Sequence, residues 1–211
     1  MGIGHVAVGL GLKRMDRRVN VGWLIFAALL PDFLLGWFTL AGWETYAVPA
    51  NFASGHYLLF TFPWSHGLLA HAVWAALAGF TAWRLTGRRI AAAAIGIAVL
   101  SHFLLDGIVH VQGLPLVGAG PLFGLGLWRW LPLALAIEGA MAVLALWFLP
   151  GRRIGMTVYI ALLAVFLIVG QAAGSEVPPR TGLIASWLIA PPLMAAIAGW
   201  LDRKKRRAAN A

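Results

Sequence analysis

The sequence predicts an all-α membrane protein with about six transmembrane helices and a short, half-buried N-terminal helix. The chain of 211 residues is 61% hydrophobic and only 11% charged, whereas soluble domains carry roughly 25% charged residues. Its mean hydropathy is +0.84, and the apolar residues fall into runs of about the length that a helix needs to cross the hydrocarbon core. The chain has no cysteine, which excludes disulfides, thiolate metal sites and thiol nucleophiles.

The apolar runs can be taken in order along the chain. Residues 1–12 are apolar and glycine-rich but too short to span, so they predict the half-buried arm. The six longer runs, each bounded by basic residues or by irregular loops, are 21–42, 66–83, 90–110, 131–149, 155–173 and 182–201. Two long loops connect them at 43–65 and 111–130. We therefore expect one transmembrane domain over residues 1–201 and a basic tail over 202–211.

The residues behind the net charge of +9 are expected to lie mostly on one side of the membrane. Nearly all of the 16 lysines and arginines lie in four clusters, at 13–18, 84–89, 152–153 and 202–211. With six spans these clusters fall on one side, and the positive-inside rule makes that side cytoplasmic, with both termini. The charge is thus a topology signal and not a nucleic-acid-binding one, and the tail is expected to contact anionic lipid headgroups.

A group of ionisable residues marks the predicted span 90–110. His102, Asp106 and His110 follow one another at intervals of four residues, which places them on one helix face. Such side chains are costly in hydrocarbon and are expected to face a protein interior or a wet cavity. Imidazole and carboxylate are also ligands of zinc and other divalent transition metals.

Other intramembrane ionisable residues fall at the same depth. Counting a rise of about 1.5 Å per residue from the nearest basic anchor places them about 18–26 Å above it, in the outer half of a ~30 Å core. The residues of this layer are His5, Asp32, His66, His71, His102, Asp106 and Glu138. Their common depth predicts a single site.

Not every member of the layer need serve that site. His71 follows His66 by five residues, about 140° around a helix, so the two cannot both face one small site. His66 is preferred because it begins a helix beside the outer loop. His71 and Glu138 are equally well read as structural hydrogen-bonding groups, and His56 as an ordinary polar loop residue.

Four motifs resemble the bacterial membrane-bound metal-dependent hydrolase family. They are Gly4-His5, Pro31-Asp32, Ser65-His66-Gly67 and Ser101-His102 through Asp106, and the resemblance covers roughly residues 1–140. The His-x-x-x-Asp element is also similar to that of secreted zinc-dependent phospholipase C enzymes. A smaller group of poorly characterised bacterial membrane proteins is more similar still, through His110, Leu114-Pro115-Leu116, Gly124 through Trp128, and Glu138.

The chain departs from the broader family at two places. Leu34 stands where the family has a second aspartate, and Phe62-Pro63-Trp64 stands where it has His-Arg-Gly. A centre of two or three metal ions would lose ligands, so one metal ion, or none, is expected.

The resemblance implies a hydrolase of the bacterial inner membrane that acts on a phosphoester or related bond of a lipid or amphiphilic substrate. The expected cofactor is a divalent metal, zinc first, with manganese or iron as alternatives. The implied ligands are His5, Asp32, His66, His102 and Asp106. His110 or Glu138 would be the general base or would support the ligands.

Two other functions remain open on the sequence. The same polar layer could carry a proton, ion or metal through a transporter, or it could join helices in a non-catalytic scaffold. The oligomeric state is left open.

Overall fold

The structure, a computed structural model, describes residues 2–55, 57–149, 154–173 and 176–209. Over these residues the protein is all-α apart from two short hairpins, which confirms the predicted fold class. Its helices are α1 (Gly2–Leu12), α2 (Val21–Ala28), α3 (Leu30–Leu40), α4 (Phe52–Gly55), α5 (Leu68–Thr86), α6 (Arg89–Val109), η1 (Leu127–Trp130), α7 (Leu131–Phe148), α8 (Ile154–Ala173) and α9 (Arg180–Ala209). Its strands are β1 (Thr45–Ala47), β2 (Leu59–Thr61), β3 (Leu114–Pro115) and β4 (Leu122–Phe123).

Several helices are long and apolar enough to cross a membrane. Within the described residues these are α5, α6, α9 and α7 with the η1 turn before it, and the bent pair α2–α3 would make a fifth. Helices α1 and α8 are also apolar. The chain is therefore a membrane protein, while the expectation of six complete spans stays a prediction.

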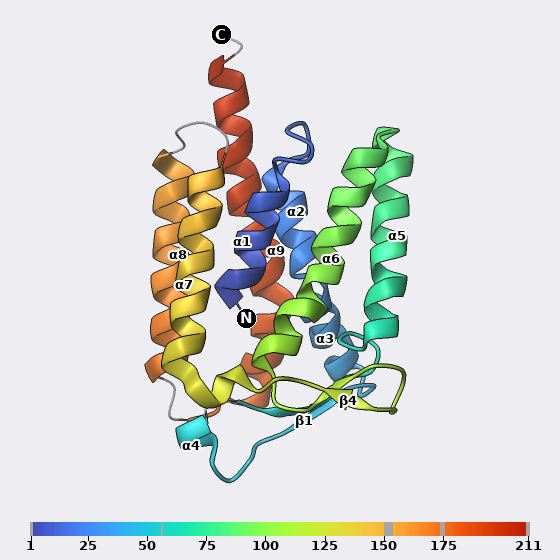
Figure 1. Ribbon diagram of the computed structural model, residues 1–211, viewed down its shortest axis with the longest axis vertical. Coiled ribbons are helices and arrows are strands. Elements are labelled where there is room, and N and C mark those ends of the chain that lie inside the picture. The colour runs from blue at the N-terminus through green and yellow to red at the C-terminus, as the bar shows by residue number, and fades with distance from the viewer. Residues whose placement is uncertain (1, 56, 150–153, 174–175, 210–211) are drawn as a thin grey trace.

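The helices form two outer pairs around a central group. In Figure 1, α5 and α6 stand on one side, α7 and α8 on the other, and α1, α2 and α9 fill the middle. Helix α1 packs against α2, α6, α7 and α8, and Ile3, Val6 and Leu10 are fully buried. The predicted short N-terminal helix is therefore present, and the bundle encloses it on several sides.

The first predicted span is broken in the middle. Helices α2 and α3 meet at an angle of 51°, and Leu29 both ends α2 and precedes α3. Pro31 lies in the first turn of α3, where its missing N–H costs nothing. The break places Asp32 at a helix N-terminus, whose dipole favours a carboxylate.

The two long loops cover one end of the bundle. Strands β1 and β2 pair antiparallel, as do β3 and β4, where the sequence predicted irregular chain. Behind them Phe62 and Leu114 are buried against Leu35 of α3 and Phe103 of α6. The hairpins therefore close the end of the bundle to which Asp32 and the C-terminal half of α6 point.

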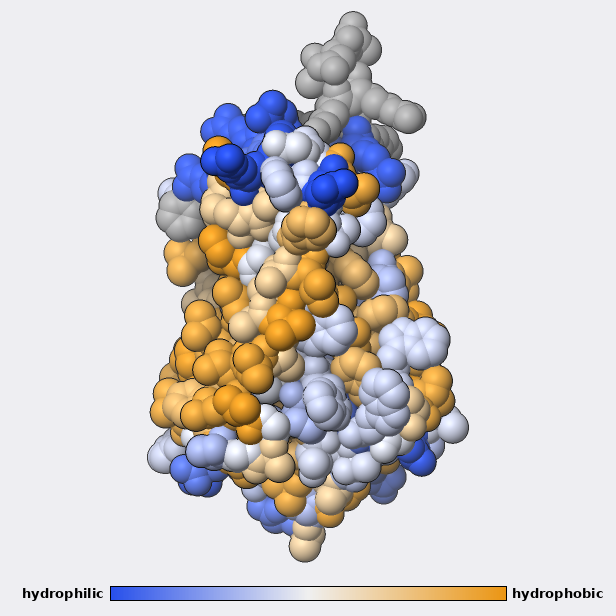
Figure 2. Space-filling view, turned by 90° about the vertical axis from the view of Figure 1, so that its right-hand side faces the viewer, coloured by the Kyte–Doolittle hydropathy of each residue, from blue (hydrophilic) through white to orange (hydrophobic). Residues whose placement is uncertain are grey.

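The opposite end carries the basic residues. Figure 1 places the α1–α2 turn, the α5–α6 turn and the C-terminal part of α9 at this end, and Figure 2 shows hydrophilic side chains there above a broad apolar belt. The basic turn at 152–153 lies outside the described residues. Helix α9 continues to Ala209 without a break at 202, and Asp202 is buried and forms an ion pair of 2.8 Å with Lys13. The predicted tail therefore begins inside the bundle.

Helices α2 and α9 approach closely at Gly22. A Cβ at this position would lie 2.4 Å from the Ala195 carbonyl oxygen and 2.9 Å from Gly199 Cα. Both neighbours are backbone atoms and cannot rotate away. Glycine at position 22 therefore sets the distance between the two helices.

Gly22→Ala is expected to destabilise the protein by about 1–3 kcal/mol, because the added methyl group forces α2 and α9 apart. Thermal unfolding in detergent, followed by loss of the monodisperse peak, would measure this as a lower midpoint. Gly139→Ala is the matched control, since a Cβ there meets no atom within 4 Å and alanine is the better helix former. Equal midpoints for the two variants would contradict the assigned packing.

Candidate metal centre

The polar layer predicted from the sequence meets at one place. Asp106 and His102 come from α6, His66 from the segment before α5, and Asp32 from the first turn of α3. His5 arrives from α1. These five side chains make contacts of 3.1–3.7 Å with one another.

The ring of His102 is fixed by α2. Its Nδ1 lies 2.7 Å from the carbonyl oxygen of Ala28, the last residue of α2, where helix carbonyls lack intrahelical partners. A carbonyl oxygen only accepts, so Nδ1 carries the proton. In the neutral ring Nε2 then presents a lone pair, and this atom faces the cluster.

The ring of His66 is fixed by a short chain of hydrogen bonds. The Glu44 carboxylate accepts bonds from the backbone N–H groups of Trp64 and Ser65, both 2.8 Å, and from Ser65 Oγ at 2.7 Å. Because the Ser65 hydroxyl donates to Glu44, its oxygen is free to accept from His66 Nδ1, 2.7 Å away. The Nε2 of neutral His66 is thus also a lone pair directed at the cluster.

Glu44 was not among the residues predicted for the site. It is 1% exposed although it lies in a loop. Burial raises the pKa of its carboxyl, and the bonds from Ser65 and Trp64 act in the opposite direction. A sequence signal existed, since the chain has only 7 acidic residues and this one lies in an aromatic loop just before the Ser65-His66 motif.

The Asp106 carboxylate contacts four histidines of the cluster. Its Oδ1 lies 3.1 Å from His5 Nε2. Its Oδ2 lies 3.3 Å from His102 Nε2, 3.5 Å from His110 Nε2 and 3.6 Å from His66 Nε2. The His5 ring also stacks on His102, with centroids 3.8 Å apart and planes at 5°, so α1 holds both residues in place.

Asp32 is the most accessible member of the cluster. Its Oδ1 lies 3.6 Å from His66 Nε2 and 3.7 Å from His102 Nε2. The Asp32 side chain is 30% exposed, against 3% or less for His66, His102 and Asp106. It therefore forms the open side of an otherwise buried group.

These donors fit a divalent metal ion. Two groups are placed to hold one, His5 with His102 and Asp106, and Asp32 with His66 and His102, and within each group the ligand atoms lie within 4.8 Å of one another. The Nε2 atoms of His66 and His102 are only 3.2 Å apart beside two carboxylates, so the repulsion between their lone pairs is removed either by a proton shared between the rings or by a cation that both rings bind. Ligands at 2.0–2.2 Å from a tetrahedral zinc ion are separated by about 3.3–3.6 Å, and the separations among Asp32, His66 and His102 are 3.2–3.7 Å.

A small pocket lies over the open side of the cluster. It has a volume of about 130 Å³ and is lined by Asp32, His66, Asp106 and His110 together with Phe60, Phe62, Trp128 and Trp187. The aromatic walls come from β2, the following turn, η1 and α9. Apolar walls around a few convergent polar groups are typical of a ligand site.

Two residues of the layer have other contacts. His71 Nδ1 lies 2.9 Å from the Gly67 carbonyl, and its buried Nε2 has no hydrogen-bond partner among the described residues. Glu138 Oε2 accepts a bond of 3.0 Å from the N–H of Ile3, so Glu138 caps the first turn of α1, which carries His5. His56, which the sequence predicts to be an ordinary polar loop residue, lies outside the described residues.

Comparisons of the chain with protein-family models, with curated proteins and with solved structures gave no match. The resemblance carried by the motifs therefore stays a prediction.

Ser65→Ala is expected to lower the affinity for the metal about 10–100-fold, because His66 loses the group that fixes its tautomer. Competition with a fluorescent chelator would measure the change. Ser186→Ala is the control, since Ser186 is exposed and its hydroxyl bonds only the local Leu183 carbonyl among the described residues. Equal affinity in the two variants would show that the chain from Glu44 to His66 has no effect on the site.

Proposed function

We propose that the protein is a membrane-embedded hydrolase that uses one divalent metal ion to cleave a phosphoester or related bond of a lipid or amphiphilic substrate. The observation that supports it is the meeting of two fixed imidazole lone pairs with two carboxylates below an aromatic pocket. The motif resemblance points the same way.

Each residue of the cluster has an assigned role. His66 and His102 would be the nitrogen ligands and Asp32 the oxygen ligand that faces the pocket, with Asp106 buried beside both imidazoles. His5 holds Asp106 through Oδ1, and Glu138 holds α1. A ligand set of nitrogen and oxygen at tetrahedral separations favours zinc, with manganese or iron as alternatives.

When bound, the ion would polarise the scissile group and acidify water at the site. His110, which lines the pocket, accepts the proton of the attacking water as the water oxygen bonds to phosphorus. The bond from phosphorus to the leaving oxygen breaks, and the proton taken up by His110 passes to that oxygen.

The proposed setting is the bacterial inner membrane. The basic clusters would face the cytoplasm with both termini, so the hairpins and the pocket would lie toward the outer leaflet. A lipid substrate could then enter from that leaflet, and anionic headgroups would gather at the basic end.

Transport is a second candidate function, and one observation favours it. The α2–α3 break places Asp32 at the N-terminus of a half-helix, as in the discontinuous helices of secondary transporters. Under this alternative the same residues bind an ion in transit.

The test is hydrolysis by the purified, zinc-loaded protein of phospholipids and polyprenyl phosphates in mixed micelles. We expect turnover that chelator abolishes, and a His110→Gln variant that keeps its metal but turns over about 10²–10⁴-fold more slowly. Bound metal without hydrolysis of either class, together with zinc or proton flux in proteoliposomes, would favour the transporter instead.

A further inference from the structure

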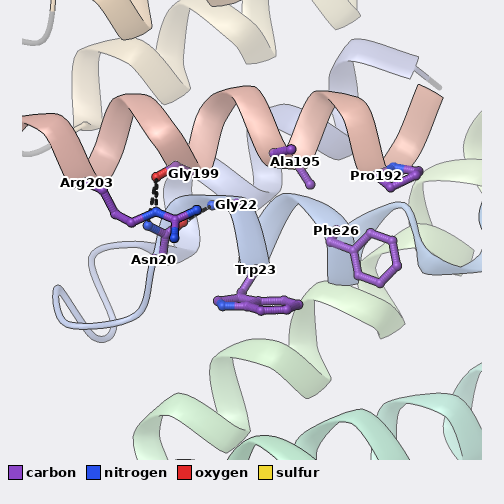
Figure 3. A pocket seen from close by; sticks show the side chains of 9 residues that line it. Asn20, Gly22, Trp23, Phe26, Pro192, Ala195, Gly199 and Arg203 are labelled. Carbon is purple, nitrogen blue, oxygen red and sulfur yellow. Dashed lines mark hydrogen bonds between the residues drawn. The ribbon is translucent and has the colours of Figure 1, made fainter. Parts of the chain in front are cut away.

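A second and larger pocket lies at the basic end, away from the metal centre. It has a volume of about 570 Å³, within the about 300–1,000 Å³ range of small-molecule sites. Figure 3 shows it between α2 and α9, with Asn20 and Arg203 at one end and Phe26 and Pro192 at the other. We call this pocket the α2–α9 groove.

The groove changes from polar to apolar along its length. At the basic end Asn20 is fixed, since its amide donates to the Gly199 carbonyl and accepts from the N–H of Gly22. Beyond it the lining consists of Trp23, Phe26 and small or apolar residues of α9. Trp23 is 66% exposed, so no described element covers this face.

Arg203 provides a free positive charge at the polar end. Its Nε donates to the Gly199 carbonyl at 3.3 Å, which fixes the side chain over the groove. No carboxylate pairs with it in the part of the chain that the structure describes, in contrast to Lys13 and Arg88, which pair with Asp202 and Asp16. A guanidinium held by one nitrogen keeps its terminal nitrogens for a phosphate.

The length of the groove matches one leaflet. Pro192 and Arg203 are eleven residues apart on α9, which corresponds to about 16 Å of helix, and half of a bilayer core is about 15 Å. An amphiphile with an anionic head at Arg203 and an acyl chain along Trp23 and Phe26 would therefore end near Pro192.

We propose that the α2–α9 groove binds one anionic phospholipid of the leaflet at the basic end, with its phosphate on Arg203 and one acyl chain along α2. This site is separate from the metal centre and does not depend on hydrolysis. Charge complementarity and the length of the groove favour a lipid as its occupant. A second copy of the chain would instead place its own Arg203 or an apolar helix against the Arg203 guanidinium.

The experiment is native mass spectrometry of the full chain in detergent, titrated with phosphatidylglycerol or with phosphatidylcholine of the same acyl chains. Wild type is expected to retain one phosphatidylglycerol in preference to phosphatidylcholine. Arg203→Gln is expected to lower the affinity for phosphatidylglycerol about fivefold, the factor that corresponds to about 1 kcal/mol per basic residue. The affinity for phosphatidylcholine should not change. Ala196→Phe, at an exposed lining position, is expected to weaken both lipids by filling the groove.

Arg84→Gln is the matched control, because it removes one exposed positive charge at the same end on α5. If it weakens phosphatidylglycerol as much as Arg203→Gln does, the preference comes from diffuse surface charge and the proposed site is wrong. Undiminished lipid binding by Ala196→Phe would also overturn the proposal. So would a wild-type dimer that Ala196→Phe abolishes and the other variants keep, because a second copy of the chain would then occupy the groove. Failure of the hydrolysis assay would leave each of these results unaffected.

Discussion

Replacing His102 by alanine is expected to reduce the metal content of the purified protein from about one ion per chain to background. His102 belongs to both groups of donors that can hold an ion, so its loss leaves neither complete. Elemental mass spectrometry of detergent-purified protein, after growth with added zinc, manganese or iron, would measure the difference and name the metal. Turnover should disappear with the metal.

His71→Gln is the control for this result. His71 is as buried as His102 and their rings lie 5.6 Å apart, but it belongs to neither donor group. We expect this variant to keep its metal and both variants to elute as monodisperse protein. Absence of metal from the wild type after supplemented growth would contradict the metal centre, and loss of metal from His71→Gln would place a ligand at position 71.

Breaking the buried ion pair between Lys13 and Asp202 is expected to produce the largest loss of stability. Both side chains are 1% exposed or less. Lys13 also donates to the Val19 carbonyl, and Asp202 accepts from the N–H of Val21 at 3.1 Å. Lys13→Met or Asp202→Asn leaves a buried charge without its partner, which costs about 3–5 kcal/mol.

The double variant distinguishes this cause from simple loss of packing. Lys13→Met with Asp202→Asn removes both charges, so it should be several kcal/mol more stable than the sum of the single effects predicts. Unfolding midpoints in detergent for the four proteins would give the coupling. Arg18→Gln is the control, because Arg18 is 77% exposed and lies 3.6 Å from Asp16, and it should change stability by less than about 1 kcal/mol. Additive single effects would contradict the assignment.

The sequence predicted the meeting of the polar residues because helix rise is constant. Depth along a helix follows from residue number alone, so His5, Asp32, His66, His102 and Asp106 could be placed in one layer before their helices were placed side by side. The spacing of His102, Asp106 and His110 likewise predicted a common helix face. In the structure, His102 Nε2 lies 3.3 Å and His110 Nε2 3.5 Å from the Asp106 carboxylate.

What the sequence did not predict depends on contacts between distant segments. Burial of α1 requires α7 and α8, and pairing of β1 with β2 brings Thr45 to Thr61. The part played by Glu44 appears only when the loop folds back on Ser65. The bend at Leu29 had a local signal in Pro31, but its angle is set by packing against α9 and α6.

The enclosed position of α1 has a consequence for biosynthesis. The Ile3 N–H of α1 donates a hydrogen bond to Glu138, a residue 135 positions later, and at about 5–20 residues per second that partner is made about 7–27 s after Ile3. During this interval α1 must wait at the membrane or against α2, without the helices that finally enclose it. The bundle therefore closes around α1 late in synthesis, and a chain interrupted before α7 would leave His5 without a fixed place.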